Sequence, residues 1–174
     1  MSPSTTAAAD AQRHASTEEM SPCELCHHLR DLIAERIGDV KGMCADASLI
    51  LACALRRRGL DARVCTGAYV MDGAELGDGD EEHAHVRCDG LIYDPTREQF
   101  DDLPLVSGED SDEYQGASWG AESPPECPLP SDLAEYFYRC YPSDNCYIRG
   151  SFLRICTELG IGDLTVLRPS PSVD

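Results

Sequence analysis

The sequence has no apolar run long enough to cross a membrane, and it has few basic side chains. A transmembrane helix needs about 20 mainly apolar residues, and no stretch of this chain approaches that length. Lysine and arginine number 14 against 32 aspartates and glutamates, which gives a formal net charge of −18. The lack of a long apolar run means that we expect no membrane span. Because phosphate contacts require clustered basic side chains, we expect no nucleic-acid-binding surface either.

The first 20 residues also lack the features of a secretory signal. They contain neither a basic n-region nor an apolar h-region, and their composition predicts a polar, disordered leader. We therefore expect a cytoplasmic protein with a single domain over residues 21–168 and a frayed tail over residues 169–174. Nothing in the sequence indicates an oligomeric state.

Ten cysteines are an unusual feature of a chain without an export signal. A disulfide scaffold is typical of short secreted proteins, whereas this chain is long enough to bury a core without such crosslinks. Several of the cysteines lie within apolar or strand-like patterns, where a free thiol behaves as a small hydrophobic side chain. We interpret most of them as reduced core thiols, in particular Cys53, Cys65, Cys88 and Cys156.

Two helices are predicted in the N-terminal part. Residues 22–37 carry apolar side chains at a 3.6-residue period, with Ser21 as the N-cap and Gly38 as the stop. Residues 44–58 are rich in alanine and leucine and are apolar on most sides, which indicates a buried helix. Cys44 is the first residue of this second helix.

Strands follow the two helices. Residues 62–71 and 83–88 have strand-like patterns, and an Asp-Gly turn at residues 89–90 leads into a third strand at 91–93. This order predicts an α+β domain in which the N-terminal helices pack on an antiparallel sheet.

The C-terminal half is less regular. Residues 107–130 are rich in glycine, proline, serine and acidic side chains, which predicts an irregular acidic excursion. Two further helices are expected at residues 132–141, with Ser131 as the cap, and at residues 147–159.

Cys44 is the cysteine best placed for catalysis. A cysteine at a helix N-terminus faces unpaired backbone N–H groups and the positive end of the helix dipole, which lower the pKa of its thiol. The same amides can hold an oxyanion, and Gly42 allows the backbone to approach a substrate closely. Gln99 is a further candidate for positioning a carbonyl oxygen. Taken alone, however, a cysteine at a helix start is more often structural.

Two histidines and an aspartate supply the other groups that a cysteine nucleophile needs. His83 and His85 share one face of a strand, because alternate side chains point the same way. A two-residue hairpin turn pairs His85 directly with Asp94 and leaves His83 as a diagonal neighbour within reach. Geometry alone therefore permits either histidine to be a base held by Asp94.

Two segments, GMCADASLILACALRRRG and HAHVRCDGLIYDPTREQF, resemble the transglutaminase-like branch of the papain-type cysteine enzymes, in particular its small bacterial members of unassigned substrate. The resemblance extends over residues 40–103, and its most specific part is the ending DPTREQF. It implies a nucleophile at Cys44, a base at His83 and an orienting residue at Asp94. His85 stands where the family usually has an aromatic residue, so His85 stays an alternative base.

The resemblance also implies a reaction class. We expect acyl transfer from an amide or thioester through an acyl-enzyme, which water would resolve in an amidase or peptidase and an amine in a transamidase. The substrate would be a small molecule, a peptide or a carrier-bound acyl group, and no cofactor is required.

Two other functions stay open. Cys23 and Cys26 have the spacing of half a zinc site, which would belong to a zinc-stabilised binding module. The ligands that would complete it are Cys140 with either Cys146 or Cys127. Alternatively, the chain is a catalytically inactive interaction protein that keeps the fold.

Overall fold

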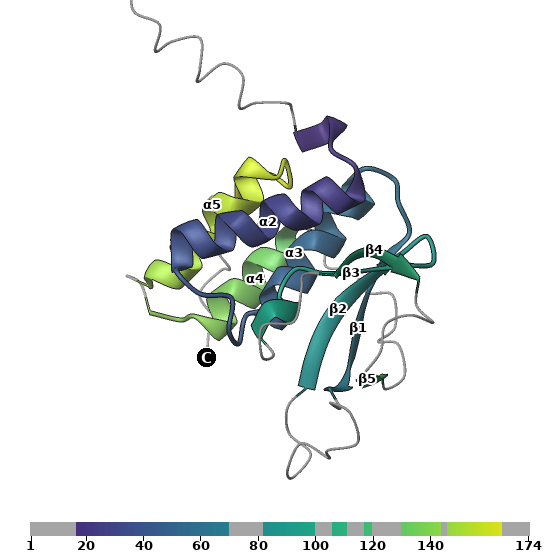
Figure 1. Ribbon diagram of the computed structural model, residues 1–174. Helices are drawn as coiled ribbons and strands as arrows, with labels where there is room; N and C mark the ends of the chain where they lie inside the picture. The colour runs from purple at the N-terminus through teal and green to yellow at the C-terminus, as the bar shows by residue number, and fades with distance from the viewer. Residues whose placement is uncertain are drawn as a thin grey trace, which may run out of the picture.

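A computed structural model describes residues 17–69, 82–99, 106–110, 117–119, 130–143 and 146–164. Its elements are, in chain order, η2 (Thr17–Glu19), α2 (Pro22–Ile37), α3 (Cys44–Arg57), β1 (Ala62–Tyr69), β2 (Glu82–Cys88), β3 (Leu91–Asp94), η4 (Arg97–Gln99), β4 (Val106–Asp110), β5 (Ala117–Trp119), α4 (Pro130–Cys140) and α5 (Tyr147–Glu158). Figure 1 shows the helices gathered on one side of the molecule and the strands on the other. The predicted α+β class, with helices packed on an antiparallel sheet, is confirmed.

The described strands form one antiparallel sheet in the order β4-β3-β2-β1-β5. The β2–β3 hairpin turns at Asp89 and Gly90, both of which have a positive φ. A type I′ turn requires this conformation at both central positions, which is why an Asp-Gly pair is favoured there. The register is the predicted one, with the pairs Cys88–Leu91, Arg87–Ile92 and Val86–Tyr93.

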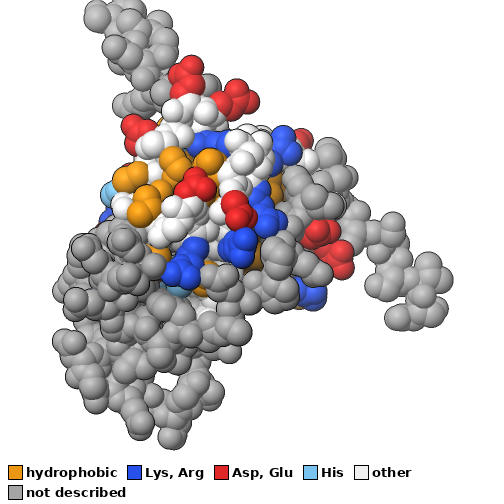
Figure 2. Space-filling view, turned by 90° about the vertical axis from the view of Figure 1, so that its right-hand side faces the viewer, with side chains coloured by type: hydrophobic (Ala, Val, Ile, Leu, Met, Phe, Trp, Pro, Cys, Tyr) orange, Lys and Arg blue, Asp and Glu red, His pale blue; other side chains and the backbone are white. Residues whose placement is uncertain are grey.

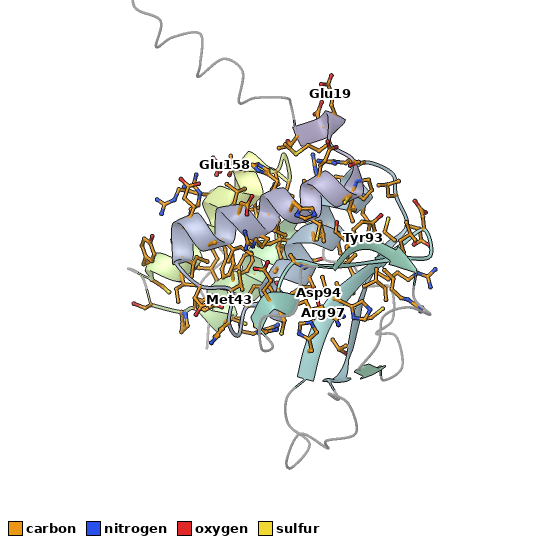
Figure 3. The ribbon with its side chains drawn as sticks, in the orientation of Figure 1. Glu19, Met43, Tyr93, Asp94, Arg97 and Glu158 are labelled. Atoms are coloured by element: carbon orange, nitrogen blue, oxygen red, sulfur yellow. The ribbon has the colours of Figure 1, made fainter. Side chains whose placement is uncertain are left out.

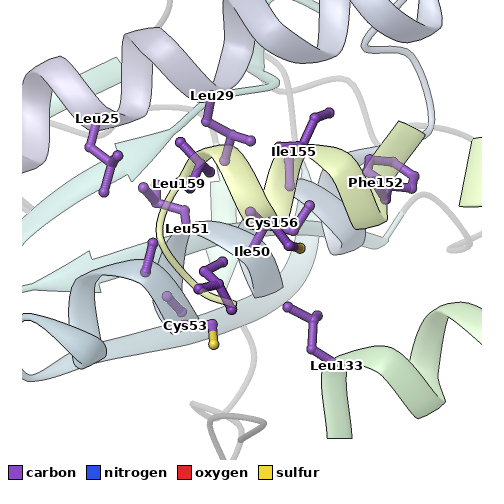
Figure 4. Packing of buried hydrophobic residues seen from close by; sticks show 14 of the residues in the cluster. Leu25, Leu29, Ile50, Leu51, Cys53, Leu133, Phe152, Ile155, Cys156 and Leu159 are labelled. Atoms are coloured by element: carbon purple, nitrogen blue, oxygen red, sulfur yellow. The ribbon is translucent and has the colours of Figure 1, made fainter. Parts of the chain in front are cut away.

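α3 lies at the centre of the molecule. It packs on β1 and β2 on the sheet side and on α2 and α4 on the other. Nine of its 14 residues are buried, as expected from its continuous apolar sequence. Figure 4 shows side chains from several helices meeting around it, including Leu29 of α2 and Phe152 of α5. Burial of each such side chain contributes roughly 1.5–3 kcal/mol to the free energy of folding. This packing holds α3 in place, and with it Cys44, the first residue of the helix.

The cysteine prediction is confirmed where the structure describes it. The nine described cysteines are all free thiols. The four predicted as core residues are all buried: Cys53, Cys65, Cys88 and Cys156. Among the described helices, none combines the length and the apolar character that a bilayer span needs.

Two short strands lie largely within the segment predicted as an irregular acidic excursion, residues 107–130. They are β4 and β5, and they pair with β3 and β1 respectively. Their glycine, serine and acidic residues have a low intrinsic preference for strands. The strands therefore depend on pairing with a neighbour in the fold, and the local sequence does not reveal it.

The start of α4 and the end of the predicted leader also differ from the sequence prediction. α4 begins at Pro130, so Ser131 lies inside the first turn and is not the cap. Proline is favoured at the first helical position because its missing N–H needs no partner there. Within the predicted leader, residues 17–19 form η2, and the Arg58 guanidinium donates hydrogen bonds to the carbonyl oxygens of Thr17 and Met20. Residues 1–16, Cys127 and the tail from residue 165 lie outside the described residues.

Charges of both signs are mixed on the face shown in Figure 2, which is the right-hand side of the molecule in Figure 1. There the described Lys and Arg side chains lie next to Asp and Glu side chains. Elsewhere in the structure, an ion pair joins Arg30 of α2 to Glu98 of η4, with Nη2 and Oε2 2.7 Å apart. This pair fixes η4, the short helix that follows Asp94 in the chain, against α2.

Candidate active site

Cys44 is half-buried at the N-terminus of α3. The chain enters the helix through a turn in which the Met43 N–H donates to the carbonyl oxygen of Val40. Gly42 has a φ of 74° in this turn, a left-handed conformation that favours glycine. The N-cap is Met43, whose side chain has no oxygen to accept a bond from the first-turn amides. The start of α3 therefore presents backbone N–H groups beside the Cys44 sulfur.

His83 and Asp94 form a fully buried pair. Nε2 of His83 lies 2.6 Å from Oδ2 of Asp94, and both side chains are 0% exposed. The other carboxylate oxygen, Oδ1, accepts hydrogen bonds from the backbone N–H of Thr96 at 3.0 Å and from its hydroxyl at 3.2 Å. The Asp-Pro-Thr sequence thus holds its own aspartate in place, and the aspartate holds the proton of His83 on Nε2.

The side chains of Cys44 and His83 are joined by a hydrogen bond. Burial raises the pKa of the Cys44 thiol, but His83 and backbone hydrogen bonds at Ala84 and Ala45 outweigh burial, so the pKa is lowered overall. Burial lowers the pKa of His83, but Asp94 and Cys44 outweigh it and raise this pKa to about 9. The two directions favour the same state, a thiolate beside an imidazolium.

The structure brings His83, rather than the directly paired His85 of an ideal hairpin, against Asp94. Regular pairing of β2 with β3 ends at Val86 and Tyr93, one residue before Asp94. Asp94 is therefore not held opposite His85 by the ladder, and it reaches its diagonal neighbour. His85 is buried on the same strand, where it pairs across to Cys65 of β1.

Gln99 joins the two halves of the site. Its Oε1 accepts the backbone N–H of Gly42 at 3.0 Å, and its Nε2 lies 2.9 Å from Nδ1 of His83. The sequence identified Gly42 and Gln99 as positioning candidates but gave no reason to place Gln99 beside Cys44. Figure 3 shows that Asp94 and Arg97, which lead into Gln99, lie near Met43 at the start of α3.

Two parts of the site were not recognised from the sequence. Thr96 belongs to the Asp-Pro-Thr motif, and its position two residues after an aspartate is the available signal, because such a residue commonly donates to the preceding carboxylate. The Arg30–Glu98 pair holds η4 in place across 68 residues of chain, a separation over which the local sequence gives no signal.

Cys23 and Cys26 lie at the start of α2 and contact β4. The Ser107 hydroxyl donates to the Cys23 sulfur at 2.9 Å. Burial raises the pKa of Cys26 strongly, and the nearby charge of Asp94 adds to this effect. Among the described residues, no group of three or more His, Cys, Asp or Glu side chains is placed to hold a metal ion.

No protein-family model, no curated protein and no solved structure matches this chain. What the site can do therefore follows from its own chemistry. Cys44 has a thiol with a lowered pKa, His83 has a ring nitrogen that can exchange a proton, and Asp94 holds the ring through Nε2. These are the groups that a cysteine nucleophile requires.

Proposed function

We propose that this chain is a cysteine-dependent acyl-transfer enzyme of the transglutaminase-like kind, with Cys44, His83 and Asp94 as its catalytic triad. One observation carries the proposal. The His83 ring is hydrogen-bonded to the Cys44 thiol, while its Nε2 is held 2.6 Å from a carboxylate that is itself fully buried. A buried polar chain of this kind is costly to build, and it matches the needs of a thiolate nucleophile.

The reaction begins with attack of the Cys44 thiolate on the carbonyl carbon of an amide or thioester. A carbon–sulfur bond forms, and negative charge develops on the carbonyl oxygen, which the amides at the start of α3 stabilise. His83 then gives its Nδ1 proton to the departing amine or thiol, and the acyl group stays on Cys44. Asp94 keeps the ring in the orientation that both transfers need.

The acyl group is released by a second nucleophile. His83 takes a proton from water or from an amine as this nucleophile attacks the acyl carbon, and Cys44 leaves as the thiolate. Water gives hydrolysis, and an amine gives a new amide. Hydrolysis needs no second binding site, so we favour it. The donor is a small molecule, a peptide or a carrier-bound acyl group.

The test is to look for the acyl-enzyme itself. Purified protein is mixed with acyl thioesters and activated amides of different chain lengths, quenched in acid, and analysed by intact mass and by peptide mapping. We expect an adduct of one acyl group on Cys44 that decays in water, and faster or to an amide product when an amine is added. The matched control is Cys140→Ser, which removes an exposed thiol and leaves the adduct unchanged. An adduct on other cysteines alone, or none with any donor, would overturn the proposal and favour the inactive interaction protein.

A further inference from the structure

The hydrogen bonds of Gln99 depend on the protonation state of His83. The backbone N–H of Gly42 is a donor in every state, so the Gln99 oxygen must face it, as the 3.0 Å contact shows. The Gln99 NH₂ group is therefore the end that faces Nδ1 of His83 at 2.9 Å. An NH₂ group only donates, and Nδ1 accepts only while it carries a lone pair. This contact thus belongs to the uncharged imidazole.

Cys44 needs the same nitrogen, so in the uncharged pair the Gln99 NH₂ group and the Cys44 S–H compete for the one lone pair of Nδ1. Because Nε2 of His83 is engaged by Asp94, the proton that leaves the thiol has to arrive at Nδ1. When the S–H bond breaks and an Nδ1–H bond forms, two donors face each other at Nδ1. An end-for-end turn of the Gln99 amide relieves this conflict but places the NH₂ group against the Gly42 N–H. The side chain can therefore satisfy Gly42 and the uncharged ring together, but not Gly42 and the charged ring.

The backbone of Gln99 is held in place, so the side chain cannot easily move as a whole. η4 is tied to α2 by Glu98, whose carboxylate accepts from Nε and Nη2 of Arg30 at 3.1 and 2.7 Å. Gly42 lies two residues before Cys44 in the turn that leads into α3. Gln99 thereby links the nucleophile loop to the base.

We propose that Gln99 is a positioning residue that donates to Nδ1 of His83 and favours the uncharged thiol–imidazole form of the Cys44–His83 pair until its amide is displaced. The inference rests on the proposed function and adds a control over when the nucleophile forms. Asp94 from β3 and Cys44 from α3 act on His83 in the opposite direction, toward the charged ring. Of the neighbouring elements, η4 adds Arg97 and Glu98, the latter paired with Arg30, and α2 adds Cys26, which lies near Asp94.

The test compares Gln99→Ala with Glu98→Gln, a control that loosens η4 and keeps the amide. ¹⁵N NMR follows the protonation of Nδ1 of His83, and iodoacetamide measures the reactivity of Cys44 against pH. Loss of a neutral hydrogen bond changes the equilibrium between the uncharged and charged forms of the Cys44–His83 pair about fivefold. In Gln99→Ala, iodoacetamide should therefore alkylate Cys44 about fivefold faster at pH 6, and His83 should have a higher pKa. Glu98→Gln weakens the tie between η4 and α2 but keeps the amide, so its change in alkylation rate should be smaller than that of Gln99→Ala.

Slower alkylation in both variants would assign Gln99 a merely structural role and overturn the inference, as would an unchanged His83 titration in Gln99→Ala. Gln99→Glu offers a second variant. Its carboxylate accepts from Nδ1–H and should raise the pKa of His83 further than Gln99→Ala does. In the wild type alone, the Gln99 side-chain amide resonances should shift in the same step as Nδ1, and independent titrations would contradict the inference. If Cys44 is no more reactive than the other thiols in every variant, the proposed function itself fails.

Discussion

Several described helices begin beside a cysteine, and two of them, α2 and α3, differ in what surrounds the sulfur at their N-termini. At the start of α2, the Ser21 hydroxyl accepts the N–H of Glu24, and the Glu24 carboxylate accepts the N–H of Ser21 in return. This capping box uses side chains of the helix itself to satisfy its first turn. At the start of α3, the N-cap is Met43, and the sulfur of Cys44 takes part in backbone hydrogen bonds at Ala45 and Ala84.

The neighbours of the two sites differ in charge as well. Cys44 has an imidazole beside it, and its pKa is lowered although burial works against ionisation. Cys26 lies one turn into α2. Its burial raises the pKa of its thiol, and the nearby Asp94 carboxylate and Cys23 raise it further. The thiol pKa is lowered where an imidazole lies beside the sulfur and raised where a carboxylate lies near it. We therefore expect the partner that can carry a positive charge to decide which thiol becomes a nucleophile.

The largest expected effect comes from removing the sulfur of Cys44. Cys44→Ser should reduce formation of the acyl adduct by at least about a thousandfold, because a serine hydroxyl stays protonated where a thiol ionises. Cys23→Ser, at the other helix start, should leave adduct formation within about twofold. Intact-mass analysis of both variants with one thioester checks the pair, and equal losses would remove the distinction between the two helix starts.

The next effect is that of the base. His83→Ala should slow alkylation of Cys44 at pH 7 by roughly ten- to a hundredfold, because the hydrogen bond and charge that lower the thiol pKa are lost while burial remains. His85→Gln, on the same face of β2, is the matched control and should change the rate less than about threefold. A larger effect of His85→Gln, with both variants folded by circular dichroism, would make His85 the base.

A smaller effect concerns the pH profile. Activity should rise as the Cys44 thiol ionises and fall as His83 loses its proton near pH 9, because both the thiolate and the imidazolium are needed. Asp94 is one of the groups that raise the pKa of His83. Asp94→Asn should therefore move the alkaline limb of a kcat/KM profile to lower pH, by about one unit. A limb that stays near pH 9 in this variant would show that Asp94 does not support the charged ring.

The smallest effect is expected at the pair that joins η4 to α2. Arg30 and Glu98 are both about one-third exposed, so their ion pair stabilises the fold by less than about 1 kcal/mol. Arg30→Gln should lower the melting temperature by only a few degrees, which calorimetry can measure. A loss large enough to prevent folding would contradict this estimate of the pair.

The N-terminal half of the fold could be predicted from the sequence because its signals are local. Ser21 and Gly38 mark the ends of α2, and the Asp-Gly turn sets the register of β2 with β3. The same signals made Cys44, two histidines and Asp94 candidates for a site. The roles of Cys44, His83 and Asp94 came from the resemblance to the transglutaminase-like enzymes.

The remainder depended on contacts between distant parts of the chain. The choice between His83 and His85 depends on where regular pairing ends at Tyr93. The place of Gln99 depends on η4 being held against α2 by Arg30, 68 residues before its partner Glu98. β4 and β5 form by pairing with strands that the local composition does not indicate.

The most direct test of the account is a comparison of the thiols themselves. The full chain is treated with a limiting amount of iodoacetamide at pH 7, and peptide mass spectrometry gives the labelling rate of each cysteine. The account predicts that Cys44 is labelled at least about tenfold faster than Cys23, its counterpart at the other helix start, and that His83→Ala removes the difference. Labelling of Cys44 no faster than Cys23 would contradict it.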